Sequence, residues 1–455
     1  RLLRAVADAL AADAGPIVAL ADRETALGSP RLPGELTRTT YQLRLFADAL
    51  EEGSYLEVTI EHAADTAMGP RPNLRRWLVP VGPVGVFGSS NFPLAFSVPG
   101  GDTAAALASG CPVVVKAHPG HPATAQRCFE RIREAAANAG APDGTIGIVH
   151  GEAAGAAVVQ HPAIRAVGFT GSLRGGRALA DLAAGRPDPI PFYAELGSIN
   201  PLVVTPAAAA RRAGEIGTGL AASYTLGVGQ FCTKPGLAFV PAGADGDAVV
   251  DALAAATRAA APGVLLTAGV RDGFARGSED FAGAAAVTEV ARGDQPPPEL
   301  GYAVRPRVLQ VDAGELHGRL QEECFGPLVL VVRYTDEAAL LSALGRVPGS
   351  LTASLHIGPG ETDLPQRVLD VVTAVSGRVV FDGFPTGVAV AWAMQHGGPW
   401  PASTSIHTSV GITAMRRFLR PVCLQDAPVE LLPGELRDDN PDRVPQRVDG
   451  VLRLP

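Results

Sequence analysis

Apolar residues along the chain follow two patterns, short continuous runs and longer stretches with helical spacing. Continuous apolar runs bounded by glycine or proline are typical of strands that are buried on both faces. Apolar residues spaced three and four apart instead predict amphipathic helices. In the first half of the chain the two patterns alternate, which is typical of a doubly wound parallel sheet and predicts a nucleotide-binding domain. The predicted strands of this half are residues 82–88, 111–119, 145–151 and 164–172.

The strand–helix alternation begins again after residue 204 and predicts a second α/β domain. Residues 1–50 predict amphipathic helices that end at Gly53, and residues 54–63 alternate like a strand. From about residue 418, several prolines predict an irregular tail. The predicted strands of the second domain are residues 237–242, 325–334, 350–358 and 377–385.

Composition narrows the class of protein. A chain of 455 residues exceeds one ordinary core, so two or three domains are expected. A net charge of −8 without a basic run argues against a nucleic-acid partner, and no apolar run is long enough to cross a membrane. Five scattered cysteines, without a CxxC pair or zinc-type spacing, predict free thiols, no metal site and a reducing compartment such as the cytoplasm. Because the chain starts inside a helical pattern, we expect that a segment precedes Arg1.

Cys232 lies in a glycine-bordered turn within the sequence SYTLGVGQFCTKPG, residues 223–236. Glycine lets the backbone approach a ligand and leaves main-chain N–H groups free. A thiolate in such a turn is a strong nucleophile, so Cys232 is a candidate for covalent catalysis. A lone cysteine is also commonly a small buried hydrophobic residue, and this stretch alone leaves both interpretations open.

Lys116 and the turn GFTGS, residues 168–172, each follow or end a predicted strand. Ligands of doubly wound sheets bind beyond the carboxyl ends of the strands. Lys116 is therefore a candidate ligand contact, with a surface lysine as the alternative. Ser172, next to Gly171, would cap the following helix, whose free N–H groups can hold a phosphate. The same turn is also common as a helix cap alone.

Two carboxylate sites and an amide complete the candidate chemistry. Glu195 is isolated in an apolar stretch, where a carboxylate is either a general base or part of a buried ion pair. Asn91 follows a predicted strand and is a candidate oxyanion donor or a turn residue. Glu322 and Glu323 precede a Phe-Gly-Pro turn, and one of them is a candidate contact for a cofactor ribose or nicotinamide.

The content and order of these motifs resemble the aldehyde dehydrogenase superfamily across nearly the whole chain. The resemblance implies an α/β fold with a Rossmann-like doubly wound cofactor domain, a second α/β catalytic domain and a small oligomerisation or bridging element. We therefore predict a cofactor-binding domain over residues 1–197 with bridging strands inserted at 54–80, a catalytic domain over 198–412, and a tail over 413–455 that contributes to oligomerisation. The motifs that carry the resemblance are SNFPL (90–94), VVVKAHP (113–119), GFTGS (168–172), AELGSINP (194–201), GQFCTKPG (229–236) and EECFGP (322–327).

Longer segments are similar to the α-ketoglutarate semialdehyde (2,5-dioxovalerate) dehydrogenase subgroup, among them FDGFPTGVAV (381–390), HGGPWPAST (396–404) and RFLRPVCLQ (417–425). This resemblance implies oxidation of 2,5-dioxopentanoate to 2-oxoglutarate with NADP or NAD, in a homodimer or homotetramer. Two alternatives stay open. The same site would also serve a broad-specificity or fatty aldehyde dehydrogenase, and the chain could be a non-catalytic binding member of the family.

The resemblance also implies a role for each candidate residue. Cys232 would be the nucleophile that forms a thiohemiacetal and then a thioester, and Glu195 would activate the hydrolytic water. Asn91 and the main-chain N–H of Cys232 would hold the oxyanion. The implied cofactor contacts are Lys116 at the adenosine ribose or its 2′-phosphate, Ser172 and Gly171 at the pyrophosphate, Glu323 at the nicotinamide ribose and Phe325 at the nicotinamide.

The resemblance leaves two questions, the choice between NAD and NADP and the residue that binds the substrate carboxylate. Many NAD-preferring relatives carry a glutamate three residues after the strand lysine, where this chain has Pro119. The absent carboxylate removes repulsion against a 2′-phosphate, so we expect a slight preference for NADP. No substrate-carboxylate contact transfers from the subgroup. Candidates near the C-terminus are Arg416, Arg417 and Arg420, with surface arginines as the alternative.

Overall fold

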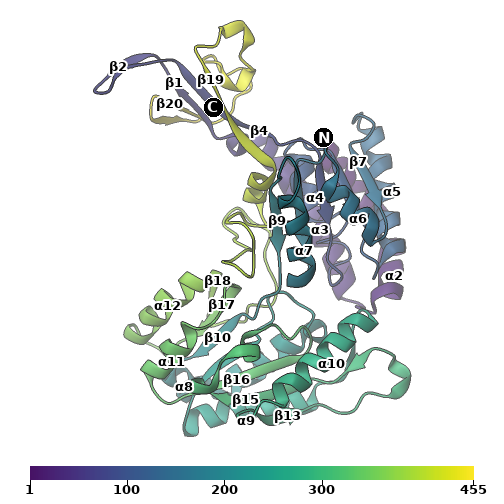
Figure 1. Ribbon diagram of the computed structural model, residues 1–455, viewed down its shortest axis with the longest axis vertical. Coiled ribbons are helices and arrows are strands. Elements are labelled where there is room, and N and C mark those ends of the chain that lie inside the picture. Colours follow the sequence, from purple (N-terminus) through teal and green to yellow (C-terminus); the bar gives the residue numbers. More distant parts are fainter.

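The computed structural model, which describes residues 1–297 and 299–455, contains two α/β bodies and a strand-rich arm. Figure 1 shows the two bodies along the long axis of the molecule, with the arm projecting from the upper one. The two parallel-strand sheets agree with the α/β fold class predicted from sequence. Within the described residues, no helix combines the length and apolar character that crossing a membrane requires.

The upper body contains a five-stranded parallel sheet with the order β7-β6-β5-β8-β9. Its strands are short, apolar and mostly buried, as expected for a sheet with helices on both faces. The chain runs from β5 outward to β6 and β7 and then crosses back to β8 on the other side of β5, which places the topological switch point of the sheet between β5 and β8. The strands are β5 (Val84–Phe87), β6 (Val113–Lys116), β7 (Ile146–Val149), β8 (Ala166–Thr170) and β9 (Phe192–Glu195).

Seven helices cover this sheet (Figure 1). The N-terminal helices pack through Leu10, Leu43 and Phe46 into the same core as β5, β6 and the helix after β6. The longest of them ends at Gly53, whose φ of 82° is left-handed and suits glycine. The helices are α1 (Leu2–Ala12), α2 (Ala14–Thr25), α3 (Arg31–Glu52), α4 (Gly101–Ala108), α5 (Pro122–Asn138), α6 (Glu152–Gln160) and α7 (Leu173–Ala184).

The lower body contains a seven-stranded sheet with the order β13-β15-β16-β11-β10-β17-β18, parallel except for the edge strand β13. Its strands are β10 (Pro201–Val204), β11 (Leu237–Pro241), β13 (Thr288–Arg292), β15 (Arg307–Asp312), β16 (Leu328–Tyr334), β17 (Ser350–His356) and β18 (Ser376–Phe381). A small ladder pairs β12 (Gly263–Val264) with β14 (Ala303–Val304). The helices are α8 (Pro206–Thr225), α9 (Ala244–Ala259), α10 (Ala268–Ala282), α11 (Glu337–Leu344) and α12 (Asp363–Val375).

The arm is a five-stranded sheet with the order β19-β4-β1-β20-β21. The expectation of an irregular tail from about residue 418 was wrong here, because residues 419–425 form β19 antiparallel to β4. Pro421 is tolerated because β19 is an edge strand, where one ladder N–H is dispensable. The strands are β1 (Val58–Glu61), β4 (Leu74–Pro80), β19 (Leu419–Gln425), β20 (Gln446–Val448) and β21 (Val451–Arg453), and a hairpin joins β2 (Ala64–Thr66) to β3 (Gly69–Arg71).

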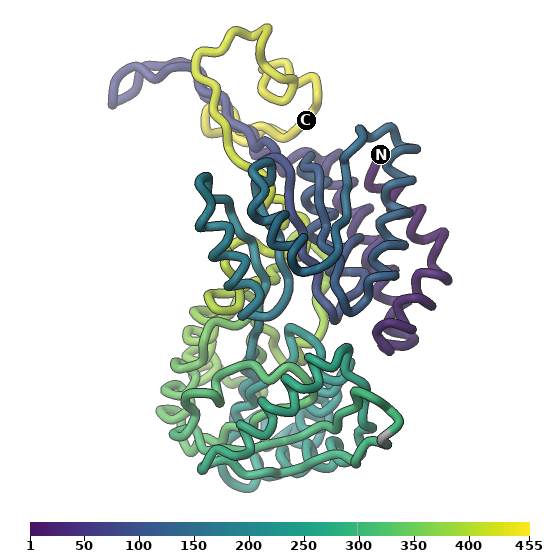
Figure 2. The backbone as a smooth tube through the Cα atoms, turned by 45° about the vertical axis from the view of Figure 1, so that its right-hand side comes forward, coloured from purple at the N-terminus to yellow at the C-terminus, as the bar shows by residue number. Residues whose placement is uncertain are grey.

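Residues 382–418 connect the lower body to the arm and pass the upper body on the way (Figure 2). The segment ends in the 3₁₀ helix Ile412–Phe418, whose Met415 and Phe418 are buried in the core of the upper body. Ser109 donates a hydrogen bond to the main-chain oxygen of Met415 at 3.2 Å. This path brings side chains from the end of the chain against strand ends of both sheets.

Candidate active site

Cys232 lies between the two bodies in a turn that glycines shape. After α8, Gly227, Val228 and Gly229 take left-handed backbone angles, with φ of 55°, 59° and 68°. A Cβ on Gly229 would overlap the main-chain carbonyl of Gly326, so the absent side chain lets two loops meet. Asn200 donates to the main-chain oxygens of Cys232 at 2.7 Å and Lys234 at 2.9 Å. The close contact at Gly229 and the hydrogen bonds from Asn200 therefore hold the turn before and after Cys232, whose thiol is partly buried.

His396 contacts the thiol directly. The Sγ of Cys232 lies 3.4 Å from Nε2 of His396, and the other ring nitrogen lies 3.2 Å from Oε2 of Glu195. Burial lowers the pKa of His396, but the thiolate of Cys232 and the carboxylate of Glu195 outweigh burial and raise it to about 9. At neutral pH the ring is therefore an imidazolium that faces the thiol, an arrangement that stabilises a nucleophilic thiolate.

Glu195 ends β9 and is buried in a network of charges. Arg417 donates from Nη2 to Oε1 of Glu195 at 2.6 Å and from Nη1 to Asp102 at 3.3 Å. Burial raises the pKa of Asp102, and Arg417 acts against that shift. Glu195 is therefore part of a buried ion pair, one of the two interpretations that the sequence left open. The carboxylate is also two hydrogen bonds from the thiol, so its role as a base stays a prediction.

Asn91 lies beside the cysteine turn. Its Nδ2 donates to the main-chain oxygen of Gln230 at 2.8 Å, and its own main-chain oxygen accepts from Arg31 at 2.6 Å. Gln230 precedes Cys232 by two residues, so the amide is held next to the nucleophile. The amide has a second N–H, which is the group that an oxyanion would use. The oxyanion role stays a prediction.

The candidate cofactor residues of the upper body lie at the carboxyl edge of its sheet. Lys116 ends β6, and Gly171 and Ser172 follow β8. Ser172 is the N-cap of α7 and accepts from the main-chain N–H of Gly175 at 3.2 Å. The main-chain N–H of Gly171 donates to the main-chain oxygen of Glu195 at 3.1 Å. Burial lowers the pKa of Lys116, whereas Glu152 opposes that shift.

This edge fits a dinucleotide. Parallel strands present their ligand site at the carboxyl ends, near the switch point that lies here between β5 and β8. The first turn of α7 is exposed and offers free N–H groups for a phosphate. The specific contact of each candidate residue with a part of the dinucleotide stays a prediction.

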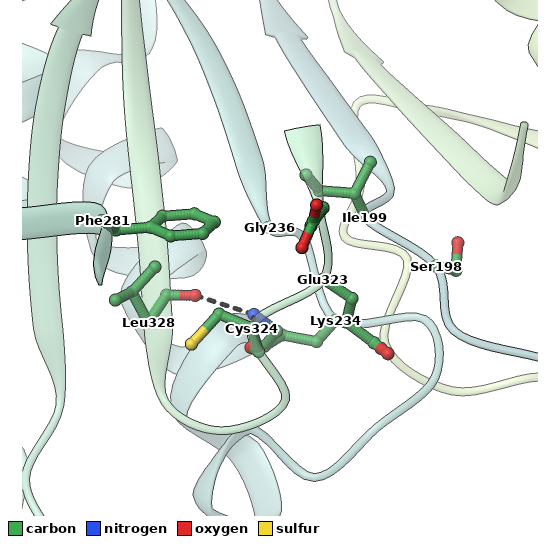
Figure 3. A pocket seen from close by; sticks show the side chains of 9 residues that line it. Ser198, Ile199, Lys234, Gly236, Phe281, Glu323, Cys324 and Leu328 are labelled. Atoms are coloured by element: carbon green, nitrogen blue, oxygen red, sulfur yellow. Dashed lines mark hydrogen bonds between the residues drawn. The ribbon is translucent and has the colours of Figure 1, made fainter. Parts of the chain in front are cut away.

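Glu323 and Phe325 lie on a loop between the lower sheet and the cysteine turn. Figure 3 shows the pocket behind this loop, where the Lys234 ammonium is buried and donates to the oxygens of Leu328 at 2.8 Å and Cys324 at 3.1 Å. Burial raises the pKa of Glu323 to about 7, with Lys234 and the Ser198 main-chain N–H acting against it. Lys234 therefore positions the loop from behind.

Sequence reasoning gave no role to His396, although it begins the motif HGGPWPAST, and it did not place Asp102 in the site. No periodic pattern links His396 to a cysteine 164 residues earlier. The proposed substrate arginines were placed wrongly. Arg417 binds Glu195 and Asp102, and Arg416 pairs with Glu57. Arg420 is exposed on β19 of the arm.

The chain is similar to several known proteins in sequence and in fold. The aldehyde dehydrogenase family model matches residues 1–362. An alpha-ketoglutaric semialdehyde dehydrogenase of Acinetobacter baylyi is 46% identical over 440 residues, covering 95% of this chain and 83% of the relative. Alpha-ketoglutaric semialdehyde dehydrogenase 2 of Azospirillum brasilense is 45% identical, covering 98% and 86%. The crystal structure of a methylmalonate-semialdehyde dehydrogenase from Oceanimonas doudoroffii matches with a TM-score of 0.78 at 20% identity, covering 94% and 85%, which concerns the fold alone.

Proposed function

Because the chain belongs to the aldehyde dehydrogenase family, we propose that this aldehyde-oxidising enzyme converts 2,5-dioxopentanoate to 2-oxoglutarate with NAD(P). The two relatives at 46% and 45% identity carry the corresponding semialdehyde dehydrogenase names and align with nearly the whole chain. The observation that carries the proposal is the contact of Cys232 with His396, and of His396 with Glu195, in a site that joins both α/β bodies.

Cys232 attacks the aldehyde carbon. The imidazolium of His396 lies 3.4 Å from the sulfur, and a neighbouring cation of this kind favours the thiolate form that attacks the aldehyde. As the thiohemiacetal forms, negative charge develops on the former carbonyl oxygen. The amide of Asn91 and the main-chain N–H of Cys232 donate to that oxygen, and because both are held in place, little reorganisation is needed.

The cofactor is held by the carboxyl edge of the upper sheet and by the loop from the lower body. Lys116 would contact the adenosine ribose or its 2′-phosphate, and Gly171 and Ser172 would contact the pyrophosphate at the start of α7. Glu323 would bind the nicotinamide ribose, and Phe325 would lie against the nicotinamide. When bound, the dinucleotide accepts the two electrons that the substrate loses. Pro119 places no carboxylate against a 2′-phosphate, so NADP is slightly preferred.

Hydrolysis of the Cys232 thioester releases the acid. Glu195 takes the proton of the attacking water, and to do so its carboxylate must turn away from Arg417 or share the proton with His396. Asp102 keeps a second carboxylate on Arg417, so the guanidinium stays paired when Glu195 moves.

A steady-state panel tests this function. NAD(P)H formation is measured with 2,5-dioxopentanoate, succinate semialdehyde, pentanal and decanal, with each cofactor in turn. We expect the highest kcat/KM for 2,5-dioxopentanoate and no turnover in Cys232→Ser. Higher kcat/KM for pentanal or decanal would support the fatty-aldehyde alternative, and no turnover with any aldehyde would support a binding protein.

The enzyme works as a homodimer or homotetramer in a reducing compartment, for which the cytoplasm is the expected place. A catalytic thiolate requires a reduced thiol, and the five cysteines are all free. The arm offers exposed strands for association with a second copy.

A further inference from the structure

Helix α3 carries two arginines on one side, Arg31 and Arg38, separated by about two helical turns. Both guanidinium groups lie over aromatic rings. The Cζ of Arg31 is 4.5 Å from the centroid of Phe92 and 4.6 Å from that of Phe231, and the Cζ of Arg38 is 5.0 Å from that of Phe96. Cation–π contacts of this kind hold a guanidinium without using its hydrogen-bond donors.

The aromatic rings join these arginines to the reacting groups. Phe231 directly precedes Cys232, and the ring of Phe96 lies 6.0 Å from that of His396. Arg31 also donates to the main-chain oxygen of Asn91. The thiolate of Cys232 is close enough to act on the pKa of Arg31 and of Arg38, opposing the lowering that burial causes. The arginines therefore border the site where an aldehyde reacts.

Three of the four terminal nitrogens of these arginines lack an acceptor. In the part of the chain that the structure describes, Nη1 of Arg31 and both Nη atoms of Arg38 are buried without a hydrogen-bond partner. Among the described residues, one carboxylate lies within ion-pair distance of these arginines: Oε2 of Glu35 is 3.8 Å from Nη2 of Arg31. Its other oxygen accepts from the N–H groups of Leu94 and Ala95. Two partly buried cations thus share one carboxylate, whose pKa burial raises.

We propose that Arg31 and Arg38 bind the carboxylate of an ω-oxo acid while its aldehyde end reaches Cys232. This inference rests on the proposed function and names the substrate class that the site selects. A carboxylate supplies the acceptors and the negative charge that the buried guanidinium groups lack. The rings of Phe92, Phe96 and Phe231 offer an apolar surface for the methylene groups between the two ends. A plain aldehyde leaves the arginines unpaired, so the site discriminates against it.

Arg38→Met tests the proposal, because the terminal nitrogens of Arg38 hold no protein group whereas Arg31 also holds Asn91. The readout is the ratio of kcat/KM for 2,5-dioxopentanoate to that for pentanal. We expect the ratio to fall about 100-fold, the range for removing one partner of a desolvated charge pair. Arg38→Lys should recover part of it. Arg44→Met is the matched control, since Arg44 lies on the same helix and pairs with Asp8 at the surface. An unchanged ratio in Arg38→Met, or an equal loss for both substrates, overturns the proposal.

Alkylation of Cys232 separates this inference from the proposed function, because it needs neither cofactor nor turnover. Iodoacetate carries a carboxylate and iodoacetamide is its neutral analogue. We expect Arg38→Met to lower the ratio of the iodoacetate rate to the iodoacetamide rate at Cys232 about tenfold. Glutathione serves as the reference thiol. Arg44→Met should leave the ratio unchanged. If the substrate panel fails but this ratio falls, the proposed substrate is wrong and the carboxylate site stands. If the panel succeeds but the ratio does not change, the carboxylate site is overturned.

Discussion

His396 connects the nucleophile to the buried charges behind it, so its charge should control thiolate formation. Replacing it with asparagine removes the imidazolium and leaves an ordinary thiol, of which only a few per cent is ionised near pH 7. We expect the rate of Cys232 alkylation by iodoacetamide at pH 7 to fall about tenfold in His396→Asn. Mass spectrometry of the Cys232 peptide measures this rate. His317→Asn, at a position that is 73% exposed in its side chain, is the control and should react as wild type.

The pH dependence of this difference has a definite sign. The folded-state pKa of His396 is about 9, above its ordinary value of 6.5. The stabilisation from its proton is therefore complete below about pH 6.5 and is lost as the pH rises through about 9. Wild type and His396→Asn should differ most in alkylation rate near neutral pH and converge above pH 9, where the imidazolium has lost its proton. A tenfold gap that persists unchanged at high pH would contradict the ion-pair account.

Arg417 is buried between two carboxylates, and its removal should destabilise the fold. Arg417→Met leaves Glu195 and Asp102 without their cation, and breaking a buried pair in this way costs about 3–5 kcal/mol of unfolding free energy. Its neighbour Arg416 pairs with Glu57 at the surface, so Arg416→Met should cost less than about 1 kcal/mol. Urea denaturation measures both values. Equal stability of the two variants would refute the structural importance of the buried network.

Asn91 supplies a side-chain donor, and its loss should affect turnover more than folding. Removing one oxyanion donor typically slows turnover by about 10² to 10³. We expect Asn91→Ala to lower kcat by that factor while the affinity for the dinucleotide persists, as measured by fluorescence titration. Near-wild-type turnover would remove Asn91 from the mechanism.

Part of the site was predictable from local sequence, and part was not. Cys232 and Glu195 have distinctive immediate neighbours, because a nucleophile needs a glycine-shaped turn and an isolated carboxylate is conspicuous in an apolar strand. Arg417 lies in the 3₁₀ helix Ile412–Phe418 and His396 in a loop, and neither has such neighbours. Their place depends on how residues 382–418 fold back on the upper body, which no local pattern determines. The unpaired donors of Arg31 and Arg38 likewise appear only when α3 packs against the loop after β5.

At the scale of elements, the loop carrying Glu323 depends on the buried ammonium of Lys234. Lys234→Met keeps the length of the side chain but leaves the oxygens of Cys324 and Leu328 without their donor. An unpaired buried acceptor costs about 1–3 kcal/mol. We expect a lower melting temperature and a raised KM for NAD(P), because the loop loses its anchor. Glu322→Gln alters an exposed side chain of the same loop and should change neither value. A normal cofactor KM in a destabilised Lys234→Met would show that the anchor serves folding alone.

Strands β5, β6, β8, β11 and β16 were predictable because each is a mostly continuous apolar run, as a strand buried on both faces requires. β19 was missed for the opposite reason. Its side chains are largely exposed, and Pro421 interrupts the pattern, although an edge strand tolerates both. Ser172 caps α7 as predicted, since an N-cap depends only on its own turn.

At the scale of the molecule, the candidate site combines groups from both bodies and from the segment of residues 382–418. The thiol belongs to the lower body, whereas Asn91 follows β5 and Glu195 ends β9 of the upper sheet. His396 comes from the segment between them, and it contacts groups from both. A small displacement of either body would therefore separate the nucleophile from its imidazolium, which explains why charged and hydrogen-bonded groups are concentrated along this segment.

The arm should be the surface through which copies of the chain associate. Its own core consists of six buried side chains, so the arm has little apolar packing of its own. Its edge strand β21 exposes Val451 and Leu452 to 63% and 57%, and an exposed apolar edge is a site for pairing with another chain. Light scattering after size exclusion should therefore give the mass of a dimer or tetramer, and Val451→Glu with Leu452→Glu should lower it. Thr373→Glu, on an exposed position of α12 far along the lower body, is the control. A monomeric wild type, or an unchanged mass in the double variant, would exclude β21 from the interface.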